Sequence, residues 1–124
     1  MQKTILIIED EPTLQKALTK SLEAEGFKIE NALDGETGLN KSLASPPDLI
    51  LLDLVLPQKN GFEVLSELKS DEKTKRVPVL VLTNLENAND VEKAISLGAT
   101  GYLVQSNYDL DDIVAKIKEI ADQK

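Results

Sequence analysis

The chain has 124 residues, a hydrophobic content of 41% and a formal net charge of −8, and it contains neither His nor Cys. This length favours one domain, which we expect to span residues 1–124. The lack of Cys excludes disulfides and thiolate metal sites, and the lack of His excludes imidazole acid–base chemistry. The negative charge argues against binding of nucleic acid by this chain and against an anionic membrane surface. Because its apolar runs are too short to cross a bilayer, the expected location is the cytoplasm.

The first half of the chain alternates apolar runs with helical stripes. Residues 5–8 form an apolar run without in–out alternation, which is typical of a strand covered on both faces. Apolar residues recur with helical spacing over 14–22, and Gly26 marks the end of that helix. Residues 27–32 alternate and therefore predict an edge strand, and residues 34–43 predict a helix with an Asp cap.

The second half continues the alternation of strand and helix. The expected strands are residues 49–52, 79–82 and 102–104. The expected helices are residues 62–68, 91–97 and 110–120. The strand over 102–104 is expected to be buried, and either Asn107 or Asp109 to cap the last helix. Five such units predict right-handed crossovers and an α/β doubly wound parallel sheet.

Three carboxylates are expected to meet at the carboxyl ends of the strands, where open α/β sheets bind ligands. Glu9 and Asp10 follow the first strand, and Asp53 ends the third. Two like charges 4 Å apart cost about 4 kcal/mol at an effective dielectric near 20, so one carboxylate stays protonated or a cation sits among them. An all-oxygen cluster suits a hard divalent ion, best Mg²⁺. Each acid alone also fits a solvent-facing or capping role, and Glu11, beside Pro12, is expected to be only a first-turn helix charge.

With these elements in place, the sequence resembles the receiver domains of two-component response regulators, the CheY-like family. The resemblance covers essentially the whole chain and implies a flavodoxin-like, three-layer (βα)5 fold with strand order 2-1-3-4-5. Its motifs are short but occur in the family's order and spacing: the acidic pair Glu9-Asp10, the pattern Asp53-x-x-x-Pro57-x-x-x-Gly61, Thr83 at the end of strand four, and Gly98-Ala99 ahead of Tyr102.

The resemblance implies a chemistry for the acidic cluster. Asp53 is the phosphoacceptor, which takes a phosphoryl group from a phosphohistidine on a sensor histidine kinase or phosphotransfer protein. Glu9, Asp10, Asp53 and the backbone carbonyl of Val55 hold Mg²⁺. The domain is then a signalling module rather than an enzyme, with self-catalysed phosphotransfer and dephosphorylation at most.

The resemblance also implies a switch. Thr83 donates its hydroxyl to the phosphoryl group, and Tyr102 swings inward behind it. This movement reshapes the face made by helix four, strand five and helix five, which a downstream protein target reads and which also offers a surface for a homodimer. Outside the family context, Thr83 fits an ordinary strand residue and Tyr102 a packed aromatic.

Two residues depart from the family pattern. Gln105 occupies the position of a Lys, and without that charge we expect weaker phosphoryl binding or a weaker signal to partners, together with readier metal binding. Asn84, where the family usually has a small residue, lines the access to Asp53 and is expected to change the lifetime of a phosphorylated state, in either direction.

Three interpretations of Gln105 stay open. In the first, the chain is a natural divergent receiver that acts as a phosphorylation-independent interaction module. In the second, it is a working receiver in which another group such as Lys59 compensates. In the third, it is an engineered receiver with an impaired switch.

Two enzyme classes are excluded. A dehalogenase-type phosphatase needs a second Asp where Val55 stands, and a flavin binder needs a phosphate-cradling loop where the acids 9–11 would repel phosphate.

Overall fold

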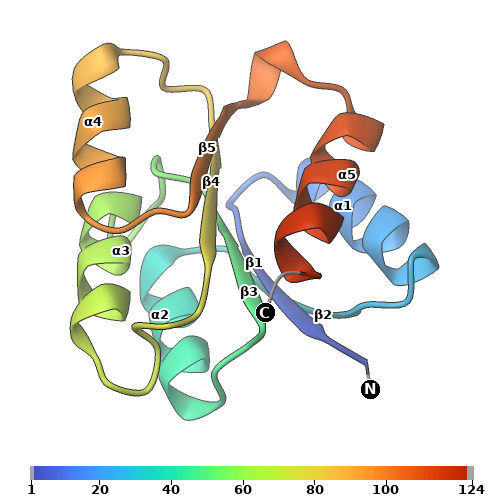
Figure 1. Cartoon of the computed structure of the whole chain (residues 1–124), viewed down its shortest axis with the longest axis horizontal. Coiled ribbons are helices and arrows are strands. Elements are labelled where there is room, and N and C mark those ends of the chain that lie inside the picture. Colours follow the sequence, from blue (N-terminus) through green and yellow to red (C-terminus); the bar gives the residue numbers. More distant parts are fainter. Residues whose placement is uncertain (1, 123–124) are drawn as a thin grey trace.

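The computed structural model describes residues 2–122, over which five strands and five helices alternate along the chain (Figure 1). The strands are β1 (Thr4–Ile8), β2 (Lys28–Ala32), β3 (Leu49–Leu52), β4 (Val79–Thr83) and β5 (Gly101–Val104). The helices are α1 (Pro12–Ala24), α2 (Gly35–Ala44), α3 (Gly61–Ser70), α4 (Ala88–Ser96) and α5 (Leu110–Ala121), with a short 3-10 helix, η1 (Gln105–Asn107), before α5.

The strands form one parallel sheet in the order β2-β1-β3-β4-β5, which confirms the predicted doubly wound α/β fold and its strand order. Successive strand residues point to opposite faces, so each strand feeds two cores. Ile5 and Ile7 pack with α1 and α5 on one face, whereas Leu6 and Ile8 pack with α2, α3 and α4 on the other. Figure 1 shows these two helix layers on either side of the sheet.

The sheet is buried at its centre and exposed at its edges. Every residue of β3 and β4 is buried, as their uninterrupted apolar runs predict. In β5 only Leu103 is buried, and Tyr102 and Val104 are half-buried. The prediction of a buried strand over 102–104 was therefore wrong, because β5 is an edge strand that pairs with β4 alone.

Acidic side chains cap α1, α2 and α5, whereas α3 and α4 begin at Asn60 and Asn87. The Glu11 carboxylate accepts hydrogen bonds from the amides of Thr13 and Leu14 at 3.2 and 2.8 Å, so Glu11 is the N-cap of α1 as well as a charge beside its first turn. Asp34 caps α2, as predicted, and Asp109 rather than Asn107 caps α5.

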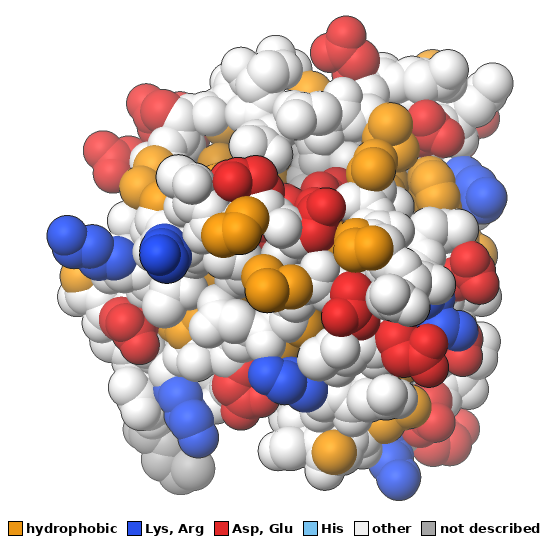
Figure 2. Space-filling model, turned by 180° about the vertical axis from the view of Figure 1, so that it is seen from behind, with side chains coloured by type: hydrophobic (Ala, Val, Ile, Leu, Met, Phe, Trp, Pro, Cys, Tyr) orange, Lys and Arg blue, Asp and Glu red, His pale blue; other side chains and the backbone are white. Residues whose placement is uncertain are grey.

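The surface mixes side chains of different kinds. On the face drawn in Figure 2, hydrophobic, acidic and basic side chains are interspersed. None of the helices within residues 2–122 combines the length and the apolar character that crossing a bilayer requires.

The loop between β3 and α3 holds a residue in a strained conformation. Gln58 has a φ of 71°, and the Lys59 amide donates to the Pro57 carbonyl at 2.8 Å, which closes a tight turn around it. A side chain in this left-handed region costs about 1–2 kcal/mol, whereas glycine adopts it freely. We therefore expect Gln58→Gly to raise the free energy of unfolding by about 0.5–1 kcal/mol in urea titrations. Gln58→Ala keeps the Cβ atom and is expected to gain nothing; an equal gain from both variants would contradict a backbone origin.

Candidate functional site

A cavity of about 280 Å³ opens at the carboxyl ends of the strands. It is lined by the ends of β1, β3, β4 and β5 together with the start of α1. The lining residues are Glu9, Asp10, Glu11, Leu14, Asp53, Val55, Thr83, Asn84 and Gln105. The structure thus brings together every residue that the sequence predicts for the site except Tyr102, which does not line the cavity.

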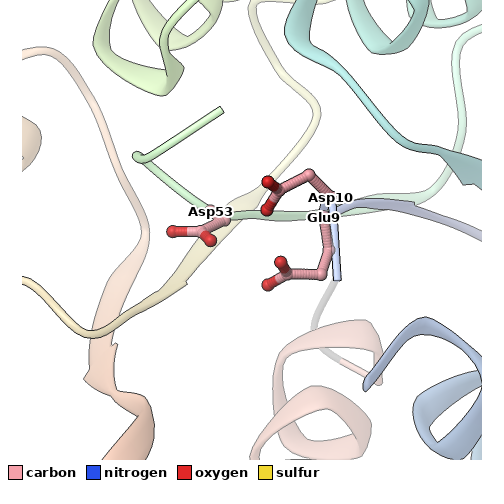
Figure 3. A group of neighbouring side chains, drawn as sticks. All are labelled: Glu9, Asp10 and Asp53. Atoms are coloured by element: carbon pink, nitrogen blue, oxygen red, sulfur yellow. The ribbon is translucent and has the colours of Figure 1, made fainter. Parts of the chain in front are cut away.

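Three carboxylates converge in this cavity (Figure 3). One oxygen each from Glu9, Asp10 and Asp53 lie within 4.8 Å of one another. Glu9 is buried, Asp53 is half-buried and Asp10 is exposed. Backbone amides fix two of them: Glu11 donates to Glu9 Oε2 at 3.1 Å, and Val55 donates to Asp53 Oδ1 at 3.2 Å.

Burial and mutual repulsion keep protons on this cluster. Burial, with the charge of Asp53 as the second cause, raises the pKa of Glu9 to about 8. Burial also raises the pKa of Asp53, and hydrogen bonds from the Thr83 hydroxyl and the Val55 amide oppose that rise. In the absence of a cation, burial and mutual repulsion therefore oppose the simultaneous ionisation of Glu9 and Asp53.

The donor set fits a hard divalent cation. Three carboxylate oxygens face one volume, and no Lys or Arg lines the cavity among the residues that the structure describes. Such an all-oxygen set matches Mg²⁺ or Mn²⁺ rather than a softer metal. Val55 also lines the cavity, where its backbone carbonyl was predicted to be a ligand.

Hydrogen bonds link Thr83, beside Asp53, to β5. The buried Thr83 lines the cavity with Asp53 and lowers the pKa of that carboxyl group, and its hydroxyl accepts from the Leu85 amide at 3.4 Å. The Tyr102 hydroxyl donates to the Leu85 carbonyl at 2.7 Å. Thr83 and Tyr102 thus meet at the backbone of the same residue, although their predicted roles in switching stay predictions.

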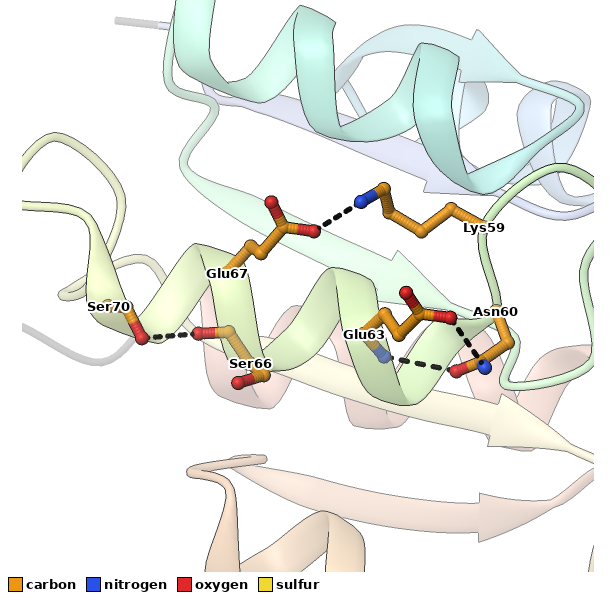
Figure 4. A network of polar contacts seen from close by, with 6 residues as sticks. All are labelled: Lys59, Asn60, Glu63, Ser66, Glu67 and Ser70. Atoms are coloured by element: carbon orange, nitrogen blue, oxygen red, sulfur yellow. Dashed lines mark hydrogen bonds and ion pairs between the residues drawn. The ribbon is translucent and has the colours of Figure 1, made fainter.

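Gln105 and Asn84 form the open rim of the cavity, and Lys59 is not part of it. Gln105 begins η1 rather than ending a strand, but it faces the acids as predicted. The Lys59 ammonium pairs with Glu67 of α3 at 2.6 Å (Figure 4). Lys59 therefore does not occupy the place of the missing Lys in this structure, and its compensation for that Lys stays a prediction.

One supporting residue was missed by the sequence analysis. Gln15 of α1 is only 4% exposed, and its side chain lies beneath the acidic loop that joins β1 to α1. Its position three residues before Leu18 and seven before Leu22 places it on the buried stripe of α1, and this spacing could have revealed it.

The family profile of the response regulator receiver domain matches residues 5–118. The chain belongs to this receiver family. Among curated proteins, the DNA-binding dual master transcriptional regulator RpaA of Synechocystis is 36% identical over 116 residues, which cover 94% of this chain and 48% of RpaA. The response regulator ArlR of Staphylococcus saprophyticus is 34% identical over 92% of this chain and 50% of ArlR. The receiver chain thus spans about half the length of the curated relatives it matches.

Solved structures agree with this fold. The Mn²⁺-bound form of the response regulator Rcp1 is 32% identical, with a TM-score of 0.83 over 95% of this receiver and 91% of that chain. A low-pH structure of the chemotaxis protein CheY4 of Vibrio cholerae has a TM-score of 0.88 over 97% of this receiver and 99% of that chain; at 23% identity it supports the fold alone.

The raised carboxyl pKa values predict that the metal-free receiver loses stability as the pH rises. Protonated Glu9 is favoured in the folded state, because its folded pKa of about 8 exceeds the ordinary value of 4.5. This contribution is complete below about pH 4.5 and is lost as the pH rises through 8. After allowance for solvent screening, we expect a loss of about 2 kcal/mol between pH 5 and 9 in urea titrations with a chelator.

Two controls isolate this effect. Glu9→Gln removes the titrating group and is expected to flatten the decline. Saturating Mg²⁺ is expected to offset it, because the cation competes with the proton for the same oxygens. A decline of unchanged size in Glu9→Gln would assign it to other groups.

Proposed function

We propose that this receiver is a phosphoacceptor switch, in which Asp53 accepts a phosphoryl group from the phosphohistidine of a sensor histidine kinase or phosphotransfer protein. The observation that carries the proposal is the setting of Asp53, which is half-buried at the end of β3, lines one cavity with Thr83 and faces Glu9 and Asp10. Carboxylates in such sites act as nucleophiles that form aspartyl phosphates.

The chemical step is a displacement at phosphorus. A free electron pair on a carboxylate oxygen of Asp53 forms the new P–O bond, while the P–N bond breaks and its electron pair stays on the imidazole nitrogen. The Val55 amide on Oδ1 fixes the plane of the attacking carboxylate. Glu9, Asp10 and Asp53, with the Val55 carbonyl, would hold Mg²⁺, which when bound neutralises charge on the transferring group. The Thr83 hydroxyl then turns to a phosphoryl oxygen.

The contacts through Leu85 transmit the change at Asp53 to the surface that partners bind. When Thr83 moves towards the phosphoryl group, the segment that holds the Tyr102 hydroxyl through the Leu85 carbonyl moves with it. The face of α4, β5 and α5 changes shape, and a downstream protein target or a second copy of the chain reads that change. The chain itself binds neither nucleic acid nor membrane and acts as a signalling domain rather than an enzyme.

A second candidate is an interaction module that does not respond to phosphorylation. It is favoured by Gln105, because no cation lines the cavity within residues 2–122 to meet a phosphoryl dianion.

The two candidates are separated by treating the protein with a small phosphodonor, or with beryllofluoride, in the presence of Mg²⁺. A switch gains one phosphoryl group by intact mass and shows shifts of the Thr83 and Tyr102 amides in NMR spectra. A protein that responds to neither reagent, with Mg²⁺ or with Mn²⁺, is the interaction module.

A further inference from the structure

A buried glutamine ties together the three backbone segments beneath the acidic cluster. Gln15 Nε2 lies 2.9, 3.1 and 2.8 Å from the carbonyls of Ile7, Glu9 and Ala32, so its two N–H groups are shared among three acceptors. These carbonyls belong to β1, to the loop that follows it and to the end of β2. One amide group of α1 thereby joins the ends of two strands to the acidic loop.

The contact fixes the backbone of Glu9 from both sides. The Glu9 amide donates to the Ala32 carbonyl at 3.1 Å, and the Glu9 carbonyl accepts from Gln15. The same Ala32 carbonyl accepts from Gln15, so the two bonds lock the loop to the end of β2. The side chain of Glu9, held by the Glu11 amide, faces Asp10 and Asp53.

The orientation of the Gln15 amide is itself determined. Asn31 Nδ2 donates to Gln15 Oε1 at 2.5 Å and to Thr19 Oγ1 at 2.9 Å. An oxygen held by Asn31 leaves only the NH₂ group to face the three carbonyls. Asn31 lies on β2 and is exposed, so it can be altered without opening the core.

We propose that Gln15 is a positioning residue for the cation site: it holds the loop from β1 to α1 so that Glu9 and Asp10 converge on Asp53. The inference rests on the cation binding of the proposed function. The like charges push the loop away from β3, and buried hydrogen bonds to the Glu9 backbone oppose that movement. Groups that orient metal ligands without touching the metal commonly change metal affinity about 10- to 100-fold.

A matched control exists at the other end of the molecule. Thr74, fully buried between α3 and β4, donates its hydroxyl to the Leu68 carbonyl at 2.7 Å. It makes the same kind of buried side-chain to backbone bond, at the amino end of β4 and away from the cavity. Thr74→Val therefore removes a comparable bond without touching the acidic loop.

The test compares wild type, Gln15→Met, Asn31→Ala and Thr74→Val in three measurements. These are Mg²⁺ affinity by calorimetry, stability by urea titration, and hydrogen exchange of the Glu9 to Glu11 amides in metal-free protein. We expect Gln15→Met to weaken Mg²⁺ binding about tenfold or more and to speed exchange at Glu9 beyond its loss of global stability. Asn31→Ala should show a smaller loss of the same kind, and Thr74→Val should lose stability with unchanged Mg²⁺ affinity.

The positioning role is overturned if Gln15→Met binds Mg²⁺ as tightly as wild type does. It is also overturned if Thr74→Val, at the same stability as Gln15→Met, weakens Mg²⁺ binding equally. Amide exchange separates this failure from that of the proposed function. If wild type binds no Mg²⁺, the cation chemistry fails, while faster exchange at Glu9 in Gln15→Met still supports the positioning of the loop. If wild type binds no Mg²⁺ and exchange at Glu9 is also unchanged in Gln15→Met, both the cation chemistry and the positioning role of Gln15 are overturned.

Discussion

Asp53→Asn is expected to abolish phosphoryl uptake from a small phosphodonor, with a loss of at least about 1,000-fold. The amide keeps the shape of the carboxylate and its place at the end of β3, but its oxygen is a poor nucleophile. Intact mass after treatment with the phosphodonor and Mg²⁺ measures the result. Asp111→Asn makes the same change on the exposed first turn of α5 and should leave uptake unchanged.

The same variant should alter the metal-free protein in a second way. The charge of Asp53 is one cause of the raised pKa of Glu9, so its removal lowers that pKa. At pH 8 the ionised Glu9 then meets less repulsion, and we expect a gain of about 1 kcal/mol in the free energy of unfolding, together with weaker Mg²⁺ binding. Phosphoryl uptake that persists in Asp53→Asn would contradict the assignment and direct attention to Asp10.

The central strands were predictable because short runs of neighbouring apolar residues determine them. An apolar run of four residues without alternation, such as Leu49–Leu52, can only be a strand covered on both faces or a short buried helix, and the turn residues around it decide for the strand. Parallel strands place their carboxyl ends along one edge, so the convergence of Glu9, Asp10 and Asp53 follows from the order of the elements.

The contacts that were not predicted depend on tertiary geometry. The pairing of Lys59 with Glu67 is set by the path of the strained loop around Gln58, which sequence spacing does not specify. The bond from Tyr102 to the Leu85 carbonyl joins residues of two segments through backbone atoms, which carry no sequence pattern. The exposure of β5 follows from its edge position rather than from its composition.

Gln105→Lys is expected to weaken the binding of cations in the cavity and to strengthen the binding of anions. A unit positive charge in the same cavity repels a bound dication, so Mg²⁺ affinity should fall about tenfold or more. The same charge favours the phosphoryl dianion and should tighten beryllofluoride binding at saturating Mg²⁺. It should also pair with the carboxylates in metal-free protein, lower the pKa values of Glu9 and Asp53, and reduce the loss of stability at high pH.

Gln105→Met separates charge from hydrogen bonding, because it keeps the length of the side chain and removes only the amide. If the charge decides the preference, Gln105→Met should bind Mg²⁺ as wild type does. A Met variant that loses Mg²⁺ affinity as strongly as the Lys variant would instead assign the effect to the amide of Gln105. Beryllofluoride binding by the Lys variant alone would identify Gln105 as the residue that disables the switch, since the three carboxylates and Thr83 are otherwise in place around the cavity. Tight binding by both proteins would show that the bound cation and the neutral donors of Thr83 and Asn84 suffice to hold a phosphoryl group without a lysine.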